Sequence, residues 1–105
     1  MDHRHAARCL EKLGNPTRLE IFRLLVRAGP EGLAVGEIQE RLEIPGSTLS
    51  HHIGHLVNAG LVRQACAGRV LRCTPNDALM NRVIGFLNAQ CCAGLGAPAR
   101  KPEAG

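Results

Sequence analysis

The chain has 105 residues, a formal net charge of +4 and a hydrophobic fraction of 45%, values typical of one small domain with a modest core. Aromatic residues make up 2% of the chain, with no Trp or Tyr, which excludes a protein that binds single strands by stacking bases on aromatic rings. No apolar run is long enough for a membrane span, and residues 1–5 lack the apolar segment of a signal peptide. We therefore expect a cytoplasmic protein with a polyanionic partner and no membrane partner.

The first part of the chain carries apolar residues at helical spacing. A short helix is expected at residues 4–13. A second helix should begin after Asn15, which can cap it, with Pro16 in its first position, and should run to about Ala28. The apolar stripes consist of Ala6, Cys9, Leu10 and Leu13 in the first helix and Leu19, Ile21, Phe22, Leu24, Leu25 and Val26 in the second.

Two further helices are separated by a tight turn. A third helix is expected at residues 35–42, and the Ile-Pro-Gly turn at residues 44–46 joins it to a fourth helix from Ser47 to about Ala59. Their inward-facing residues should be Val35, Ile38 and Leu42 in one, and Leu49, Ile53, Leu56 and Val57 in the other. This order of helix, short turn and helix is typical of DNA-binding proteins.

A β-hairpin and a last helix follow. The strands are expected at residues 61–66 and 69–74 around Ala67-Gly68, and the helix from about residue 75 to Cys91 or Cys92. Residues 93–105 are rich in Gly, Ala and Pro and are expected to form a flexible tail. We therefore expect one domain at residues 1–92, followed by that tail.

The helix that begins at Ser47 has the composition of a DNA recognition helix. Its first turn must enter the major groove, so small hydroxyl residues suit it and bulky apolar groups do not. The hairpin is then expected to act as a wing whose arginines, Arg69 and also Arg63 and Arg72, hold phosphates. The alternative is that the hydroxyls only cap the helix and the histidines form a solvated face. The residues expected to bind DNA are Ser47, Thr48, Ser50, His51, His52 and Arg69.

Three stretches of the sequence resemble the ArsR/SmtB repressors. They are LGNPTR with the following IFRLL at residues 13–25, STLSHHI at 47–53, and LVNAGLV at 56–62. The resemblance covers about residues 6–92. It implies a mostly α-helical fold with a β-hairpin wing, a winged helix-turn-helix, which forms a homodimer through its first and last helices. It also implies a transcriptional repressor, not an enzyme, that binds double-stranded operator DNA and leaves it when an inducer binds.

The family places its inducer sites at several positions, and the residues of this chain distinguish them. One common site uses two cysteines in the third helix, where this chain has Ala34 and Gly36, which cannot bind a metal. A zinc site along the last helix uses Asp and His, but Asp77 has no His between residues 76 and 92. Some arsenic-responsive members carry a vicinal cysteine pair at the end of this helix. The resemblance therefore implies that Cys91-Cys92 binds trivalent arsenic, as arsenite or methylarsenite, because soft thiolates select soft centres.

The number of sulfur ligands leaves two arrangements open. Arsenite takes up to three sulfurs, and residues 94–105 contain no further cysteine. A methylated or aryl arsenical would need only Cys91 and Cys92, because carbon takes its third position. Alternatively, the partner subunit's Cys9 supplies the third sulfur, since first and last helices form the dimer interface of this family. If it does not, Cys9 is a small core residue. The expected metal ligands are therefore Cys91, Cys92 and Cys9.

Other functions compete with arsenic sensing. A persulfide- or peroxide-responsive repressor of the same fold would form a bridge between thiols, and it would need Cys9 as a distant partner because adjacent cysteines strain a disulfide. A thiol enzyme would need a cysteine at a helix N-terminus or beside a cation, which this sequence does not suggest. An architectural DNA binder would leave the pair idle. Cys66 and Cys73 are expected to be filler, because Cys66 should face Arg69 across the hairpin.

Overall fold

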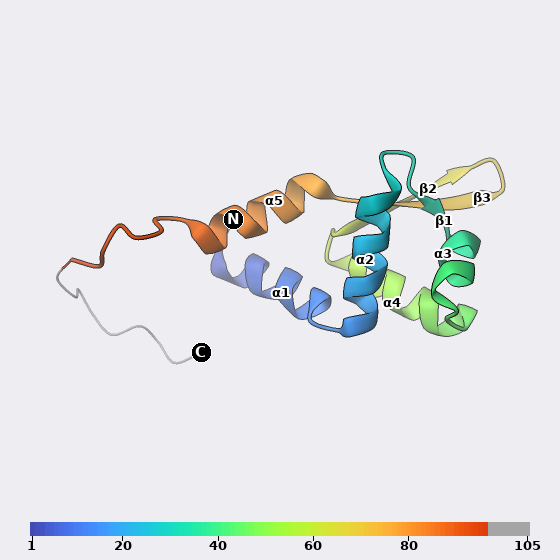
Figure 1. The fold of residues 1–105 in the computed structure, drawn as a ribbon, viewed down its shortest axis with the longest axis horizontal. Coiled ribbons are helices and arrows are strands. Elements are labelled where there is room, and N and C mark those ends of the chain that lie inside the picture. Colours follow the sequence, from blue (N-terminus) through green and yellow to red (C-terminus); the bar gives the residue numbers. More distant parts are fainter. Residues whose placement is uncertain (97–105) are drawn as a thin grey trace.

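In a computed structural model, which describes residues 1–96, the chain forms five α-helices and a three-stranded antiparallel sheet (Figure 1). The elements are α1 (His3–Leu13), α2 (Pro16–Ala28), β1 (Leu33–Ala34), α3 (Val35–Leu42), α4 (Gly46–Asn58), β2 (Val62–Ala67), β3 (Val70–Pro75) and α5 (Asp77–Asn88). This is the winged helix-turn-helix expected from the sequence: α3 and α4 form the helix pair, and β2 and β3 form the wing. The first four helices lie within one residue of their expected bounds. Most of the expected tail, residues 97–105, lies outside the described residues.

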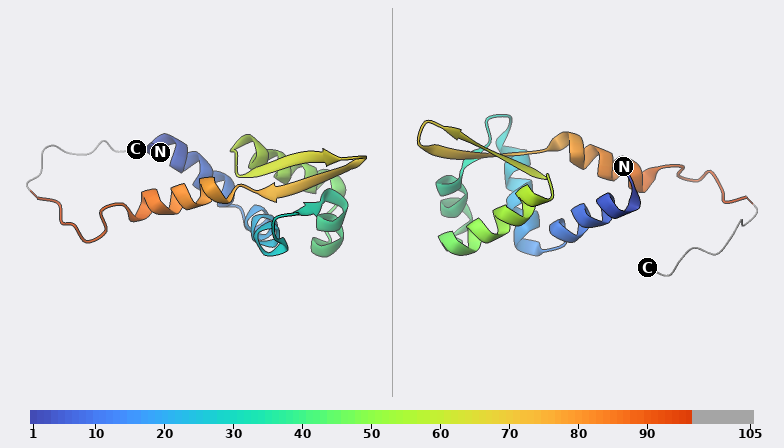
Figure 2. Two further views of the ribbon diagram at one scale, coloured as in Figure 1. Left: turned by 90° about the horizontal axis from the view of Figure 1, so that it is seen from above. Right: turned by 180° about the vertical axis from the view of Figure 1, so that it is seen from behind.

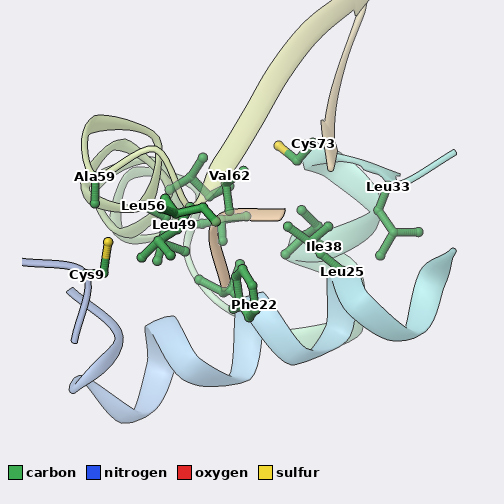
Figure 3. Packing of buried hydrophobic residues seen from close by; sticks show 14 of the residues in the cluster. Cys9, Phe22, Leu25, Leu33, Ile38, Leu49, Leu56, Ala59, Val62 and Cys73 are labelled. Atoms are coloured by element: carbon green, nitrogen blue, oxygen red, sulfur yellow. The ribbon is translucent and has the colours of Figure 1, made fainter. Parts of the chain in front are cut away.

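The core is built around α2, which packs against α1, α3, α4 and β3 (Figure 3). The apolar stripe of α2 is narrower than the sequence suggested, because Leu19 and Val26 are 45% and 49% exposed. Burying a large aliphatic or aromatic side chain stabilises a fold by about 1.5–3 kcal/mol, so the central cluster supplies much of the stability. Its large members are Ile21, Phe22, Leu25, Leu33, Ile38, Leu49, Ile53, Leu56, Leu61, Val62, Leu79 and Val83.

Local signals explain where α2 begins. The side-chain Oδ1 of Asn15 accepts hydrogen bonds from the backbone N–H groups of Thr17 and Arg18, at 2.9 and 3.1 Å. Pro16 occupies the first position of the helix, where no backbone N–H is needed. These contacts fix the corner between α1 and α2, and they hold Arg18 at the N-terminal end of α2.

The strand β1 was not expected from the sequence. Its two residues pair with β3, Leu33 opposite Cys73 and Ala34 opposite Arg72, so the sheet order is β1-β3-β2. Gly32 makes this close approach possible. It has φ +66°, and a Cβ at this position would lie 2.0 Å from the carbonyl oxygen of Cys73. A two-residue strand leaves no periodic pattern in a sequence, because its pairing partner is about forty residues away.

The turn of the wing lies one residue later than expected. The strands pair with Ala67 opposite Val70 and Cys66 opposite Leu71, so the turn consists of Gly68 and Arg69 rather than Ala67 and Gly68. The expectation that Cys66 faces Arg69 is therefore wrong. Gly68 adopts φ +68°, a conformation that suits glycine in a tight hairpin turn. The shift moves Arg69 from a strand to the tip of the wing.

The last helix ends earlier than expected. α5 stops at Asn88, and residues 89–92 form turns, so neither Cys91 nor Cys92 is helical. The physical reason is the length of its partner, since α5 packs against α1, which begins at His3. The rings of His3 and Phe86 are in edge contact at 4.9 Å between centroids, near the end of that packing. Beyond this point no described helix covers α5.

The arrangement separates two ends of the molecule (Figure 2). α1 and α5 lie side by side at one end, while α3, α4 and the wing lie at the other, with α2 between them (Figure 1). Among the described residues, no helix is both long and apolar enough to cross a membrane.

Candidate nucleic-acid interface and thiol site

The helix α4 presents a polar face opposite its buried stripe. Leu49, Ile53 and Leu56 face the core, whereas the predicted DNA-binding residues Ser47, Thr48, Ser50 and His51 are exposed and His52 is half-buried. The helix is preceded by Pro45, whose side chain provides no cap, and the Pro45 carbonyl accepts the first backbone hydrogen bond from Leu49, at 2.9 Å. Capping therefore does not account for the hydroxyl residues in the first turn, and they remain available to a ligand.

The wing offers one arginine at its tip and holds two others in internal contacts. Arg69 is exposed in the turn. Arg72 donates to the carbonyl oxygens of Glu31 and Gly32, at 3.1 and 3.2 Å, and lies 3.8 Å from the Glu37 carboxylate. The guanidinium of Arg63 lies 3.4 Å from the side-chain oxygen of Asn76.

These contacts give Arg72 a structural role, because it ties β3 to the segment before β1 and to α3. Among these three arginines, Arg69 is therefore the one whose side chain makes no hydrogen bond or ion pair within residues 1–96, whereas Arg72 is engaged in internal contacts. Arg63 lies at the base of the wing, where β2 begins, and is less favourably placed than the tip.

Histidines on α4 contact cations from two other helices. Lys12 Nζ on α1 lies 3.0 Å from His55 Nδ1, and Arg18 Nε on α2 donates to His52 Nδ1 at 3.2 Å. The Nε2 atoms of His51 and His55, one helical turn apart, lie 3.2 Å from each other. The sequence did not suggest these two cations. The one signal for Arg18 is its place in the LGNPTR stretch at the start of α2.

The surroundings of two of these histidines disfavour the charged form of the ring. Partial burial lowers the pKa of His52, and the charge of Arg18 and then His51 lower it further. Loss of solvation also lowers the pKa of His55, with further contributions from Arg18 and Lys12. These surroundings favour the uncharged rings, which can act as hydrogen-bonding groups.

The thiol pair lies just after α5, at the end of the molecule away from the wing. Cys91 and Cys92 are both exposed, and their sulfur atoms are 3.5 Å apart. The backbone forms turns here, with positive φ at Gln90 and Cys92 and a hydrogen bond from the Cys91 N–H to the Asn88 carbonyl at 3.1 Å. A centre that bonds each sulfur at about 2.3 Å, as thiolate-bound metals do, can span this separation.

Cys9 and Cys73 lie in a different environment. Each is 0% exposed and belongs to the core cluster (Figure 3). Burial raises the pKa of both thiols, and for Cys73 a hydrogen bond from the Gln64 side chain at 3.5 Å partly offsets this. Cys9 would have to leave the core to bind a metal, so the structure favours a site of two sulfurs over one completed by Cys9.

The remaining cysteine, Cys66, is exposed on β2 and is opposite Leu71, while Gln64 is opposite Cys73. Cys66 and Cys73 are thus not paired across the hairpin, in agreement with the expectation that they form no disulfide. Among residues 1–96, no three His, Cys, Asp or Glu side chains gather into a metal site. In the described part of a single chain, the thiol pair is therefore not accompanied by a third side chain of these types.

Comparisons with known proteins agree with this geometry. Residues 13–65 match the helix-turn-helix domain family, which spans half of the chain. A protein of Halobacterium salinarum, named as a candidate arsenical resistance operon repressor ArsR, is 40% identical over 60 residues, which are 57% of this chain and 46% of that protein. The chain spans 63% and 46% of the lengths of the two curated relatives it matches.

Solved structures extend the likeness to the whole fold. An ArsR-like transcriptional regulator from Rhodococcus sp. RHA1 has a TM-score of 0.73 at 24% identity, covering 82% of this chain and 78% of that one. HlyU from Vibrio cholerae has a TM-score of 0.69 at 29% identity, covering 88% of this chain and 99% of that one. The likeness to these structures therefore extends beyond residues 13–65 to most of the chain.

Proposed function

We propose that this chain, which belongs to the ArsR family of winged helix-turn-helix transcription regulators, represses transcription as a homodimer on operator DNA and is released by trivalent arsenic. The observation that carries the proposal is the exposed pair Cys91-Cys92, whose sulfurs lie 3.5 Å apart. The arsenical resistance repressor named among its relatives supports the choice of arsenic. The protein would act from the cytoplasm as a regulator and not as an enzyme.

The DNA interface would be the exposed face of α4 together with the tip of the wing. The first turn of α4, with Ser47, Thr48 and Ser50, would enter the major groove, and Arg69 would hold a phosphate beside it. A phosphate contact adds affinity without sequence preference. The wing would therefore position the protein on DNA, and the first turn of α4 would recognise the bases.

The dimer interface would be formed by α1 and α5. These helices leave large apolar side chains at the surface of the single chain: Leu10 is 41% exposed, Ile84 49% and Leu87 59%. A second copy of the chain would bury them and place two copies of α4 about one DNA turn apart.

The thiol pair suits a metalloid better than a disulfide. Consecutive Cα atoms are about 3.8 Å apart, below the range of about 4.4–6.8 Å usual for disulfide-bonded cysteines. Arsenous acid would exchange two As–OH bonds for two As–S bonds at Cys91 and Cys92, and the thiol protons would leave in two water molecules. Soft sulfur ligands favour this exchange over binding of hard cations.

A chain of contacts connects the thiol pair to α4. The pair follows α5, and the end of α5 touches the start of α1 through the rings of Phe86 and His3. α1 in turn contacts α4, since Arg8 donates to the Asn58 carbonyl at 3.1 Å and Lys12 lies 3.0 Å from His55. Arsenic that reorders the end of α5 would shift α1 and so change the spacing of the two recognition helices. Coupling between two sites typically changes a binding affinity by about 5- to 150-fold. Arsenic would therefore weaken DNA binding by some such factor, and DNA would weaken arsenic binding by the same factor.

The test is to titrate arsenite and methylarsenite against the protein bound to a DNA duplex that it has enriched from a randomised library. Arsenic should release the wild-type protein. The Cys91→Ser and Cys92→Ser variants should bind DNA equally well and lose the response. Cys66→Ser is the matched control, since Cys66 is also an exposed thiol, and it should respond like the wild type. If the double variant is released at the same arsenic concentration, the sensor site lies elsewhere.

The alternative is a thiol-based redox or persulfide-responsive repressor of the same fold. HlyU, one of the similar structures, is also known in a reduced form, which is compatible with this alternative. In this chain, however, Cys9 is buried and cannot reach a distant thiol without a change in the core. Release of DNA by peroxide or polysulfide, with no effect of arsenic, would favour the alternative.

A further inference from the structure

The ring nitrogens of two histidines on α4 face side chains that can only donate hydrogen bonds. Arginine and lysine carry N–H groups and no acceptor. His52 Nδ1 lies 3.2 Å from Arg18 Nε, and His55 Nδ1 lies 3.0 Å from Lys12 Nζ. Both Nδ1 atoms must therefore carry a lone pair. Each neutral ring accordingly has its proton on Nε2.

The same reasoning extends to His51. The Nε2–H of His55 points at His51 Nε2, 3.2 Å away, so His51 accepts at Nε2 and has its own proton on Nδ1. The chain Lys12, His55, His51 thus occupies the Nε2 atom of His51. No hydrogen bond within residues 1–96 uses the Nε2–H of His52, which leaves this donor available to a ligand.

We propose that Arg18 and Lys12 are positioning residues for DNA recognition, which hold the histidines of α4 in single tautomers so that His52 offers an Nε2–H donor to an acceptor on DNA. The proposal rests on the proposed DNA-binding function. The acceptor chemistry is a guanine O6 or N7 edge in the major groove or a phosphate oxygen, and we favour a base edge because His52 lies in the second turn of α4, one turn on from the exposed hydroxyl residues of the first turn. A fixed donor would reject base edges that themselves present a donor.

The charges around the histidines decide how acid affects this arrangement. Arg18 from α2 and His51 from α4 face His52, while Lys12 from α1, Arg18 from α2, and His51 and His52 from α4 face His55. All of these groups are cationic or neutral. A second proton on Nδ1 of His52 would point at the Arg18 guanidinium and remove the acceptor that Arg18 uses, so acid should release the ring from Arg18.

The same contacts argue against a metal ion between His51 and His55. A metal at His55 Nε2 would require the proton of that ring to move to Nδ1, where Lys12 already donates. The 3.2 Å separation of the two Nε2 atoms is therefore better explained by a hydrogen bond than by a vacant zinc site.

The first test observes the tautomers directly in the full chain labelled with ¹⁵N-histidine. Long-range ¹⁵N–¹H NMR spectra should show His52 and His55 with the proton on Nε2 and His51 with the proton on Nδ1. Arg18→Met should mix the tautomers of His52 and raise its pKa, while Arg18→Lys should retain part of the effect. Arg8→Met is the matched control, because Arg8 binds α4 through the Asn58 carbonyl and no histidine. Unchanged His52 signals in Arg18→Met would overturn the proposal.

The second test compares the DNA sequences that variants enrich from a randomised duplex library at neutral pH. His52→Ala and Arg18→Met should lose the preference at the same base position, each by about 3- to 10-fold, the value of one hydrogen bond. The double variant should be no worse than either single variant, because both changes remove one contact. If both variants instead weaken binding to all sequences equally, His52 holds a phosphate and the base-edge assignment is wrong.

Two further outcomes separate this inference from the repressor function. If Arg18→Met lowers the salt dependence by about one unit with base preference unchanged, Arg18 is itself a phosphate contact and the positioning role is wrong. If the wild type enriches no sequence at all, the repressor function fails, and the NMR result still decides whether Arg18 and Lys12 fix the tautomers.

Discussion

The five cysteines occupy two environments, and the difference between them shows how position in the fold assigns a role to one residue type. Cys9 and Cys73 lie on the inward faces of α1 and β3 and are 0% exposed, whereas Cys91, Cys92 and Cys66 are exposed. Burial raises the pKa of the first two and removes them from reaction with soft reagents. The exposed pair follows the last helix, where no described element covers it. Only that pair combines access with a second thiol nearby.

The largest expected effect is on the rate of thiol alkylation. Under native conditions, iodoacetamide should modify Cys66, Cys91 and Cys92 readily. It should modify Cys9 and Cys73 at least about a thousandfold more slowly, because reaction there requires opening of the core. Mass spectrometry of peptides after timed alkylation measures the five rates. Fast alkylation of Cys9 would contradict the division and would restore it as a third arsenic ligand.

A substitution beside Cys73 should break the buried environment itself. Gly32→Ala places a Cβ 2.0 Å from the Cys73 carbonyl oxygen at a residue with φ +66°. We expect a loss of about 2–4 kcal/mol in the free energy of unfolding, because both the clash and the backbone strain must be relieved by moving β1 away from β3. Urea denaturation measures the loss, and alkylation of Cys73 should become faster in this variant.

Gly85→Ala is the matched control for that change. A Cβ at Gly85 meets nothing within 4 Å, and the residue lies inside α5. Alanine there should stabilise the protein by about 0.5–1 kcal/mol, since it favours the helix. Equal destabilisation by the two substitutions would show that the approach of β1 to β3 is not tight in solution.

Serine substitutions sharpen the comparison residue by residue. Cys9→Ser and Cys73→Ser should each cost about 1–3 kcal/mol of unfolding free energy, because a hydroxyl in the core loses its hydrogen bonds to water. Cys91→Ser and Cys92→Ser should change it by less than about 0.5 kcal/mol, as surface substitutions do. Thermal and urea denaturation of the four variants provide the comparison. A large loss in Cys92→Ser would mean that a dimer partner buries the pair.

The sequence predicted the helices that local signals define. Asn15 and Pro16 mark the start of α2, so the capping residues predicted its first residue correctly. The helix-turn-helix and the exposed hydroxyl face of α4 followed from the spacing of its apolar residues. In these regions, each element is specified by residues within it.

The features that the sequence did not predict depend on distant partners. β1 has only two residues and is defined by its pairing with β3. The observed hairpin turn differs from the expected one by a single residue. Ala67-Gly68 and Gly68-Arg69 both suit a two-residue turn, and only the pairing register of β2 and β3 selects between them. α5 was expected to reach Cys91 or Cys92, yet it ends at Asn88, where its packing on α1 ends. The cations beside His52 and His55 likewise come from other helices.

The buried and exposed cysteines should also differ in how they make stability depend on alkaline pH. Because the folded-state pKa of Cys9 and Cys73 is raised, the unfolded chain releases these protons first. Their contribution to stability is fully present below the ordinary cysteine pKa of about 9 and is lost as the pH rises through it toward the folded value. By pH 10 the loss should approach about 1.4 kcal/mol for each buried thiol that stays neutral in the fold. The chain contains no Tyr and only two Lys, so few other groups titrate in this range. Urea denaturation at pH 8 and pH 10 measures how far the free energy of unfolding falls between these two values. The fall should be smaller in Cys9→Ala than in the wild type. An equal fall in both would mean that Cys9 is accessible to hydroxide in the folded protein.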